Sequence, residues 1–312
     1  MNEMASKQFY ANGKLLITAE YLVLDGAKAL ALPTRFGQSL HILPLKDENI
    51  IWKSFDVEKN IWFEGIFDAQ NFDIKHSTDS KTAEMLQKIF QTAQQLPKTG
   101  QKTSAYWGGA CCVETRLTFP RNWGLGSSST LIAMFAEWCD VDKYALLAAT
   151  FGGSGYDLAC AMRDNPIFYN IGNPPIVENI IFNPPFSSQL FFVYLGKKQN
   201  SREGIARYRS KKLPPSIIAD FSDLTVAFSV ETDFSEFQKL MKTHEQQIQK
   251  IIDLTCVKDL FFADFDGEIK SLGAWGGDFV MVASNANEAQ TRHYFKSKGF
   301  DTLLTFSEMI KY

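Results

Sequence analysis

The sequence predicts a protein of mixed α and β structure (α+β) in two parts, residues 1–185 and 186–312. The chain has 312 residues, which is enough for one large domain or for two domains with separate cores. Segments with the two-residue alternation of strands are interspersed with segments of helical spacing. The stretch FNPPFSS (182–188) places two prolines and two serines between apolar runs, so we expect the two parts to join there.

The first part begins with expected strands and turns. Gly13 and the LDG at 24–26 indicate turns, because glycine tolerates turn conformations. The expected elements are a strand, turn, strand and turn over 8–26, a hairpin over 55–73, a helix over 80–96 and a strand over 105–119. Ser80 is the expected cap of the helix over 80–96.

Helices are expected in the middle of the chain and strands and helices in the second part. The apolar side chains of the segment 122–140 fall on one helical face, so a helix is expected there. Asp142 is a suitable N-terminal cap for the next helix. Later expected elements are a strand over 189–196, a long helix over 235–254, a glycine-rich turn and strand over 267–284, and a helix over 287–299.

Charge and composition exclude several classes of protein. The net charge is −3, so the surface as a whole offers no electrostatic basis for binding nucleic acid or an anionic membrane. Apolar runs stay well short of the ~20 residues that a membrane helix needs. The first residues lack the basic and apolar regions of a signal peptide, so we expect a cytoplasmic protein.

The five cysteines and four histidines do not form metal-binding or disulfide patterns. No C-x-x-C occurs, and the histidines are scattered along the chain. Free, buried thiols in a reducing compartment are therefore expected. A histidine-based metal site is disfavoured.

The most informative stretch is NWGLGSSSTLIAMFAEWCD (122–140), in which two glycines and three serines run directly into an apolar helix pattern. The first amides of a helix lack internal partners and carry a partial positive charge. Gly124 and Gly126 allow the backbone to approach a ligand closely. The hydroxyls of the three serines that follow can bind phosphate oxygens or a magnesium ion. The pattern favours a phosphate-binding loop.

Other interpretations of this stretch remain open on the residues alone. A tight turn with a serine cap needs no ligand at all. The lysine-containing phosphate loop G-x-x-x-x-G-K-[ST] is absent, and the dinucleotide motif G-x-G-x-x-G fails at Ser129. The serine hydrolase motif G-x-S-x-G is also absent.

Three segments together resemble the GHMP kinase superfamily, named for galactokinase, homoserine kinase, mevalonate kinase and phosphomevalonate kinase. ANGKLLITAEYLVLDGAKALALP (11–33) is similar to the amino-terminal motif of the family, GLGSSST (124–130) to its ATP-phosphate loop, and LGAWGGDFVMVAS (272–284) to its glycine-rich carboxy-terminal motif. The resemblance implies an amino-terminal domain like domain 2 of ribosomal protein S5 and a ferredoxin-like carboxy-terminal domain. It also implies ATP as phosphoryl donor and Mg²⁺ as counter-ion.

The resemblance assigns a role to each matching residue. Asp157 matches the catalytic aspartate, and Lys14 matches the motif lysine that pairs with the aspartate or with the acceptor. Ser128 and, as a substitute ligand, Glu137 are the expected Mg²⁺ contacts. The residues expected to bind the ATP phosphates are Gly124, Leu125, Gly126, Ser127, Ser128 and Ser129, and those expected near the acceptor in the third motif are Gly273, Gly276 and Gly277.

Each of these residues also has a structural interpretation. Ser154-x-x-Asp157 is a capping-box pattern, which would stabilise a helix and contribute nothing to catalysis. Lys14 alone would be an ordinary turn lysine. Glu20 is expected to be structural, in an ion pair.

The sequence departs from the family pattern at several positions. Asn12 and Ala19 replace the usual proline and glycine, and Trp275 replaces a glycine of the third motif, so its ring must point away from the phosphates or cover the acceptor pocket. Leu146 stands where mevalonate kinases carry a magnesium-binding glutamate. These departures leave the Mg²⁺ ligands open and keep a non-catalytic member of the family as an alternative.

The acceptor is expected to be small and already phosphorylated. GSGYDLACAMRDNPIFY resembles phosphomevalonate kinases around their aspartate, and the segment 195–212 is rich in lysine and arginine. Such charge suits a phosphorylated acceptor, although a solvated basic face is the simpler alternative. Lys198, Ser201 and Arg202 are the expected acceptor contacts.

The resemblance as a whole implies an ATP- and Mg²⁺-dependent kinase that phosphorylates 5-phosphomevalonate in isoprenoid precursor synthesis. Mevalonate kinase is the first alternative, followed by a homoserine or sugar kinase. A binding or regulatory protein with weak activity is the alternative from another class. We expect a monomer or homodimer whose partner is a small molecule, with neither nucleic acid nor membrane involved.

Overall fold

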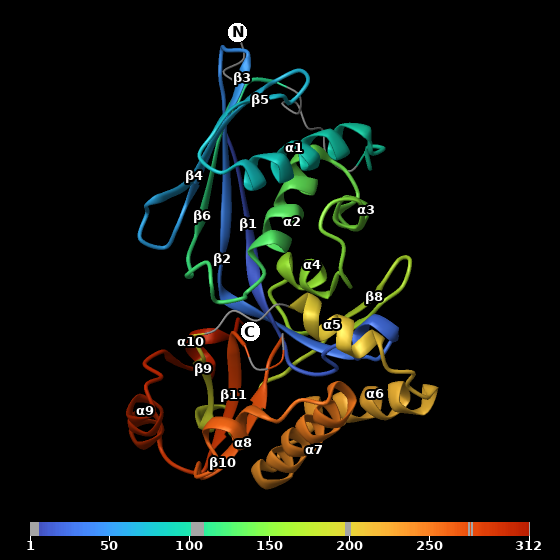
Figure 1. Ribbon diagram of the computed structural model, residues 1–312, viewed down its shortest axis with the longest axis vertical. Coiled ribbons are helices and arrows are strands. Elements are labelled where there is room, and N and C mark those ends of the chain that lie inside the picture. Colours follow the sequence, from blue (N-terminus) through green and yellow to red (C-terminus); the bar gives the residue numbers. More distant parts are fainter. Residues whose placement is uncertain (1–5, 101–108, 197–200, 274, 276, 312) are drawn as a thin grey trace. The chain divides into compact units, whose positions relative to one another are not determined.

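The computed structural model describes residues 6–311 except 101–108, 197–200, 274 and 276 (Figure 1). The chain divides into two compact units. The first unit comprises Met1–Gly13, Phe36–Arg121 and Gly126–Met162, and the second comprises Lys14–Arg35, Asn122–Leu125 and Arg163–Tyr312. Each unit is thus built from separate stretches of the chain. The boundary at 185/186 stays a prediction.

The first unit contains a sheet with helices packed on one face (Figure 1). The strand order is β5 (Ile74–Ser77), β4 (Ile61–Asp68), β3 (Asn49–Phe55), β6 (Cys111–Leu117) and β2 (Ala29–Pro44), and β1 (Lys7–Leu16) also pairs with β2. The pairing of β3 with β6 is parallel, while β4 pairs antiparallel with β3 and β5, and β6 with β2. Strict alternation of buried and partly exposed residues along β3 and β6 matches a sheet with one covered face.

Aromatic side chains join the sheet of the first unit to its helices. The helices are α1 (Ser80–Gln95), α2 (Ser127–Cys139), α3 (Lys143–Ala149) and α4 (Tyr156–Ala161). Trp52 of β3 packs against Phe90 of α1 and Phe135 of α2, with ring centroids 5.9 and 6.4 Å away. These rings are fully buried, so they pack α1 and α2 firmly on the sheet of the first unit.

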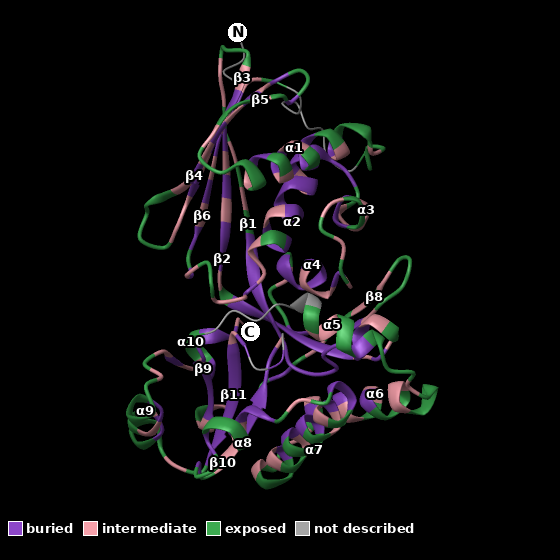
Figure 2. Cartoon of the chain, in the orientation of Figure 1, coloured by how far each residue is buried: buried purple, intermediate pink, exposed green. Residues whose placement is uncertain are grey.

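The second unit holds a four-stranded antiparallel sheet in the order β10 (Gly267–Ser271), β11 (Phe279–Ser284), β9 (Leu190–Tyr194) and β12 (Leu303–Thr305). Residues along β9 and β11 are almost all buried (Figure 2). Residues 29–31 of β2 pair with β7 (Ile167–Asn170), which pairs with β8 (Ile176–Asn179). The remaining elements are η1 (Leu22–Asp25), η2 (Ser187–Gln189), α5 (Ser201–Arg209), α6 (Pro215–Val230), α7 (Phe234–Ile252), α8 (Val257–Phe261), α9 (Glu288–Ser297) and α10 (Phe306–Met309).

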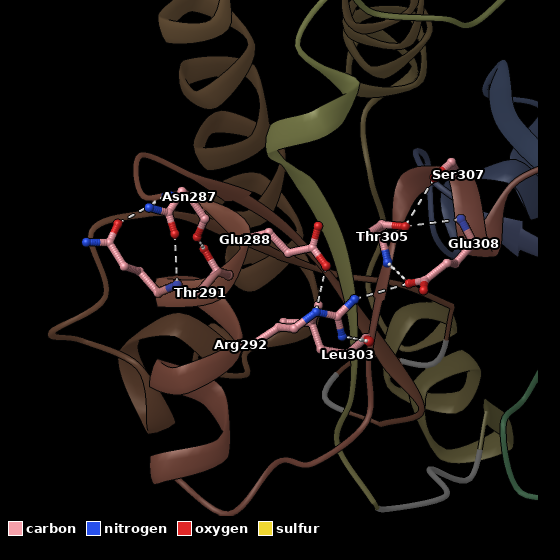
Figure 3. Close-up of polar contacts among 9 residues, drawn as sticks. Asn287, Glu288, Thr291, Arg292, Leu303, Thr305, Ser307 and Glu308 are labelled. Carbon is pink, nitrogen blue, oxygen red and sulfur yellow. Dashed lines mark hydrogen bonds and ion pairs between the residues drawn. The ribbon is translucent and has the colours of Figure 1, made fainter.

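The carboxy-terminal end of the chain is fixed by side chains and by backbone pairing. Arg292 of α9 bonds to Glu288, to the carbonyl of Leu303 and to Glu308, and so ties α9 to β12 and α10 (Figure 3). Further along, the backbone N–H of Lys311 donates to the carbonyl of Pro33, next to a bridge between Thr34 and Ile310. The last residues of the chain therefore close the second unit against β2.

Several predicted elements are confirmed. The long helix over 235–254 is α7, the helix over 287–299 is α9, and Asp142 caps α3 by accepting from the backbone N–H of Ala145. The expected Ser80 cap is wrong by one residue, because the carboxylate of Asp79 accepts from the N–H of Thr82. No helix within the described part of the chain is long and apolar enough to cross a membrane.

The predicted strand, turn, strand and turn over 8–26 is wrong in its details. Gly13 lies inside the single strand β1, which continues to Leu16. The segment that follows contains Ala19 and Tyr21 with φ of 61° and 65°, and then η1. Two non-glycine residues in the left-handed region cannot continue a strand, which is why the second predicted strand is absent from this described segment.

Candidate functional site

The helix-forming half of the glycine–serine loop lies in the first unit. α2 begins at Ser127 directly after Gly126, whose φ is 89°. Gly126 has no side chain with which to cap the helix, so the first amides of α2 stay available to a ligand. Ser128 is exposed, Ser127 is half-buried and Ser129 is buried. Thr130 anchors this turn to β2 by donating to Gln38 over 2.6 Å.

Asp157 lies against the start of α2. The hydroxyl of Ser129 donates to Oδ2 of Asp157 over 2.5 Å, and the backbone N–H of Leu158 donates to Oδ1 over 3.0 Å. The two sequence motifs that supply these residues are therefore in direct contact within the first unit. The capping-box interpretation is wrong, because α4 begins after Gly155 (φ 83°), which is the N-cap residue in place of Ser154.

The other half of the loop, residues 122–125, lies in the second unit. The backbone N–H of Lys14 donates to the carbonyl of Leu125 over 3.0 Å, and its ammonium donates to the carbonyl of Gly124 over 3.1 Å. Lys14 is only 9% exposed. The amino-terminal motif thus holds the loop through both its backbone and its side chain.

The carboxy-terminal motif reaches the same glycine. A Cβ atom built on Gly124 would lie 1.9 Å from Oδ2 of Asp278, so the Asp278 carboxylate rests directly on the Gly124 backbone. Gly124 also has a φ of 67°, which itself favours glycine. The hydroxyl of Tyr194 donates to the carbonyl of Asn122 over 3.0 Å. Residues of all three motifs therefore meet at Gly124 in the second unit.

The predicted pairing of Lys14 with Asp157 stays a prediction. Lys14 belongs to the second unit and Asp157 to the first. Within its own unit, Lys14 bonds to the loop carbonyl of Gly124, and Asp157 accepts from Ser129.

The predicted acceptor residues are described only in part. Lys198 and Gly276 lie outside the described residues, and Ser201 and Arg202 form the first turn of α5. Gly277 is buried next to Asp278, and Gly273 has a φ of 65°.

Helix α5 docks on Tyr21, which lies in the amino-terminal motif. A Cβ on Gly204 would lie 2.3 Å from the Tyr21 hydroxyl oxygen, so α5 approaches this side chain as closely as its backbone allows. Tyr208, one turn further along α5, stacks on Tyr21 at 6.0 Å and donates to the carboxylate of Asp25 over 2.5 Å. The basic segment is therefore positioned by contacts with the first motif.

A buried charge network lies behind Tyr21. Glu20 pairs with Lys270 of β10 across 2.5 Å, which confirms the expected ion pair. Burial raises the pKa of Glu20, and the charge of Lys270 opposes that rise. His244 of α7 accepts the backbone N–H of Ala19 at Nε2 over 2.9 Å. Burial and the nearby Lys270 hold the pKa of His244 well below its usual range, so this imidazole is neutral.

Trp275 is part of the same arrangement. Its backbone N–H donates to the Tyr21 hydroxyl over 3.2 Å, and its indole N–H points to the carbonyl of Thr255 over 3.4 Å. The ring is 5% exposed. It fastens the glycine-rich loop to the connection between α7 and α8.

Comparison with known proteins identifies the fold. No protein-family model and no curated protein sequence matches this chain. Solved structures do match it over nearly its whole length. A Lin0012 protein from Listeria innocua has a TM-score of 0.71 at 13% identity, with 96% of this chain and 97% of that chain covered.

Two kinases match to a similar extent. Lactococcus lactis galactokinase complexed with galactose has a TM-score of 0.70 at 11% identity, covering 99% of this chain and 94% of that chain. Streptococcus pneumoniae phosphomevalonate kinase in complex with phosphomevalonate and AMPPNP has a TM-score of 0.68 at 13% identity, covering 96% and 99%. The chain has the GHMP kinase fold. The fold class expected from the three motifs is confirmed.

The two predicted magnesium ligands of this GHMP-fold chain are not brought together. Ser128 and Glu137 are nine residues apart on α2, which places them about 13 Å apart along the axis and on opposite sides of the helix. Leu146 is fully buried in the core of the first unit. Among the described residues there is no group of three or more His, Cys, Asp or Glu side chains that could enclose a metal.

The site nevertheless suits a nucleotide-bound Mg²⁺. Such an ion is held by one or two carboxylates together with the phosphates, and it keeps several waters. In the first unit, the short hydroxyls at the start of α2 are oxygen donors of this kind. In the second unit, the Asp278 carboxylate fills the space beside Gly124 and is a carboxylate of this kind. Asp278 was not among the site residues predicted from the sequence, although it directly follows the glycines of the third motif.

Proposed function

We propose that this protein is an ATP-dependent phosphotransferase that acts on a small, anionic acceptor, with 5-phosphomevalonate as the preferred one. The observation that carries the proposal is the 2.5 Å hydrogen bond from Ser129 to Asp157. It joins the start of a phosphate-binding helix to a carboxylate that can accept a proton. The similarity to solved small-molecule kinases supports the same reaction class.

In the proposed reaction, the amides at the start of α2 and the backbone around Gly124 bind the ATP phosphates. The acceptor oxygen attacks the γ-phosphorus, a new P–O bond forms, and the bond to the β-phosphate oxygen breaks to release ADP. Asp157 accepts the proton of the attacking oxygen. Lys14 stabilises negative charge on the transferring group. Mg²⁺, when bound with ATP, supplies further charge neutralisation, and Ser128 is its proposed hydroxyl contact.

The choice of a phosphorylated acceptor rests on the basic segment and its docking. Arg207 and Arg209 lie in the last turn of α5, and the helix is held on Tyr21 through Gly204. Arginine binds phosphate through paired donors, which suits an acceptor with a phosphate group. Lys198, Ser201 and Arg202 at the start of this segment are the proposed contacts.

The test is ADP release from MgATP with mevalonate, 5-phosphomevalonate, homoserine and galactose offered separately. We expect turnover with 5-phosphomevalonate. Turnover with mevalonate alone would keep the phosphotransferase and remove the proposed role of α5 as a phosphate clamp. AMPPNP binding without turnover on any acceptor would favour a binding or regulatory protein.

A further inference from the structure

We propose that Asp278 is a magnesium-binding residue, and that its carboxylate takes the place of the glutamate that Leu146 replaces. The inference rests on the proposed ATP-dependent function and assigns a metal ligand within it. Three observations in the second unit and one in the first carry it.

The first observation is the position of the carboxylate. Asp278 rests on the backbone of Gly124, the first glycine of the phosphate loop, so closely that a methyl group at Gly124 would overlap with Oδ2. The contact brings a negative charge to the backbone that is to receive the negatively charged phosphates. A carboxylate at this position repels a nucleotide unless a cation lies between the two charges.

The second observation is how the segment around Asp278 is held. Its carbonyl accepts from the backbone N–H of Leu195 over 2.8 Å, and Phe279 pairs with Tyr194 in the sheet. Trp123 of the loop packs edge-on against Phe279 with ring centroids 5.3 Å apart. Loop and carboxylate are therefore fixed to the same strands, as a metal ligand requires.

The third observation is the cation already present. Lys14 donates to the carbonyl of Gly124 over 3.1 Å, which directs its ammonium to the loop backbone. One ammonium can offset one carboxylate, but an ATP phosphate chain adds several further negative charges. A divalent ion restores the balance.

The fourth observation concerns the competing residues. In the first unit, Leu146 is fully buried among apolar side chains, and Glu137 is about 13 Å along α2 from Ser128. Asp157 accepts from Ser129 and has the proton-accepting role in the proposed reaction. Asp278 is the carboxylate that rests on the Gly124 backbone, whereas Asp157 is bonded to Ser129 at the other end of the loop and is assigned the proton.

The experiment compares Asp278→Asn with the wild-type protein and with Asp266→Asn, an exposed aspartate of the same unit bonded to Asn285. AMPPNP binding is measured by calorimetry with and without Mg²⁺, and Mn²⁺ binding to the AMPPNP complex by electron paramagnetic resonance. In Asp278→Asn, we expect Mn²⁺ affinity to fall at least about tenfold. Metal-free AMPPNP should bind as tightly as in wild type or more tightly, because a repulsive charge is gone. Asp266→Asn should match wild type in both assays.

Two results would overturn the assignment: unchanged Mn²⁺ affinity in Asp278→Asn, or an equal loss of AMPPNP binding with and without metal, which indicates a purely structural contact. A wild-type protein that binds no AMPPNP in either condition would instead overturn the proposed function. A second measurement covers a variant that does not fold. Fe²⁺ with ascorbate and peroxide should cleave the wild-type AMPPNP complex next to Asp278, and protection of that peptide would also contradict the proposal.

Discussion

At the scale of single residues, the chain places backbone strain within the first motif and compensates for it with buried polar groups. Ala19 adopts φ 61° where the family pattern has glycine, at a cost of roughly 1–2 kcal/mol for a residue with a Cβ. The neutral imidazole of His244 accepts the Ala19 N–H, and Lys270 neutralises Glu20. The turn therefore persists because surrounding side chains fix it.

Replacing His244 by leucine should destabilise the protein. The change removes the acceptor of a buried N–H and leaves that donor unsatisfied, so we expect a loss of roughly 1–3 kcal/mol in the free energy of unfolding. Urea denaturation at pH 7 measures it. The control is His293→Leu on an exposed position of α9, which should stay within about 0.5 kcal/mol of wild type. Equal stabilities of the two variants would refute this account of the turn.

Replacing Asp157 by asparagine should separate catalysis from stability. The amide cannot accept a proton from the acceptor, so turnover should fall by roughly 10²- to 10⁴-fold with little change in melting temperature. Asp142→Ala is the matched contrast, because Asp142 caps α3. It should lose about 1 kcal/mol of stability and keep its turnover. Full activity in Asp157→Asn would exclude the proposed role.

At the scale of elements, the sequence predicts best those segments whose periodicity and caps agree. α7 has both an apolar stripe and the Asp233 cap, and its position is confirmed. α6 (PSIIADFSDLTVAFSV) was not predicted, because apolar and β-branched residues occur all around it and no polar stripe identifies it as a helix. Proline is common in the first turn of a helix, so Pro215 was the available indication that a helix starts here.

A methyl group at Gly204 should disturb the docking of α5. Alanine is the better helix former by about 1 kcal/mol, but its Cβ would lie 2.3 Å from the Tyr21 hydroxyl, so the steric effect dominates. We expect Gly204→Ala to raise KM for the acceptor severalfold and to leave AMPPNP affinity unchanged. Adding Tyr21→Phe removes the hydroxyl oxygen that lies nearest to the new Cβ, so the double variant should regain part of the lost affinity for the acceptor. An unchanged KM in Gly204→Ala would show that the contact does not position α5.

At the scale of the whole molecule, the contact of Ser129 with Asp157 was not predicted, whereas the three motifs identified the fold. The motifs identified the fold because a motif specifies backbone conformation as well as residue type, as the positive φ angles of Gly124 and Gly126 show. Asp278 and His244 were not identified, because each acts through a contact with a distant segment that no local pattern encodes. The discontinuous composition of the two units could not be predicted either. A proline-rich stretch indicates a possible linker, but it does not indicate which strands pair with one another.

Overall stability should depend on pH through Glu245. Burial raises the pKa of this carboxyl from its usual 4.5 to about 8, so the folded protein holds a proton that the unfolded chain releases. The contribution of this protonated carboxyl to the free energy of unfolding is complete below pH 4.5 and is lost as the pH rises through 8. Glu245→Gln should flatten the dependence of the urea midpoint on pH between these limits. Glu236→Gln, an exposed carboxylate on the same helix paired with Lys239, should keep the wild-type slope.

The bonding of Lys311 to Pro33 also determines when the protein can mature. All segments of the first unit have been translated once Met162 has been added, whereas Lys14–Arg35 must wait for Ile310 and Lys311 to leave the ribosome. Until then, this apolar stretch lacks its final neighbours. The second unit is therefore completed later in translation than the first, because one of its earliest segments pairs with residues added almost 150 positions after Met162.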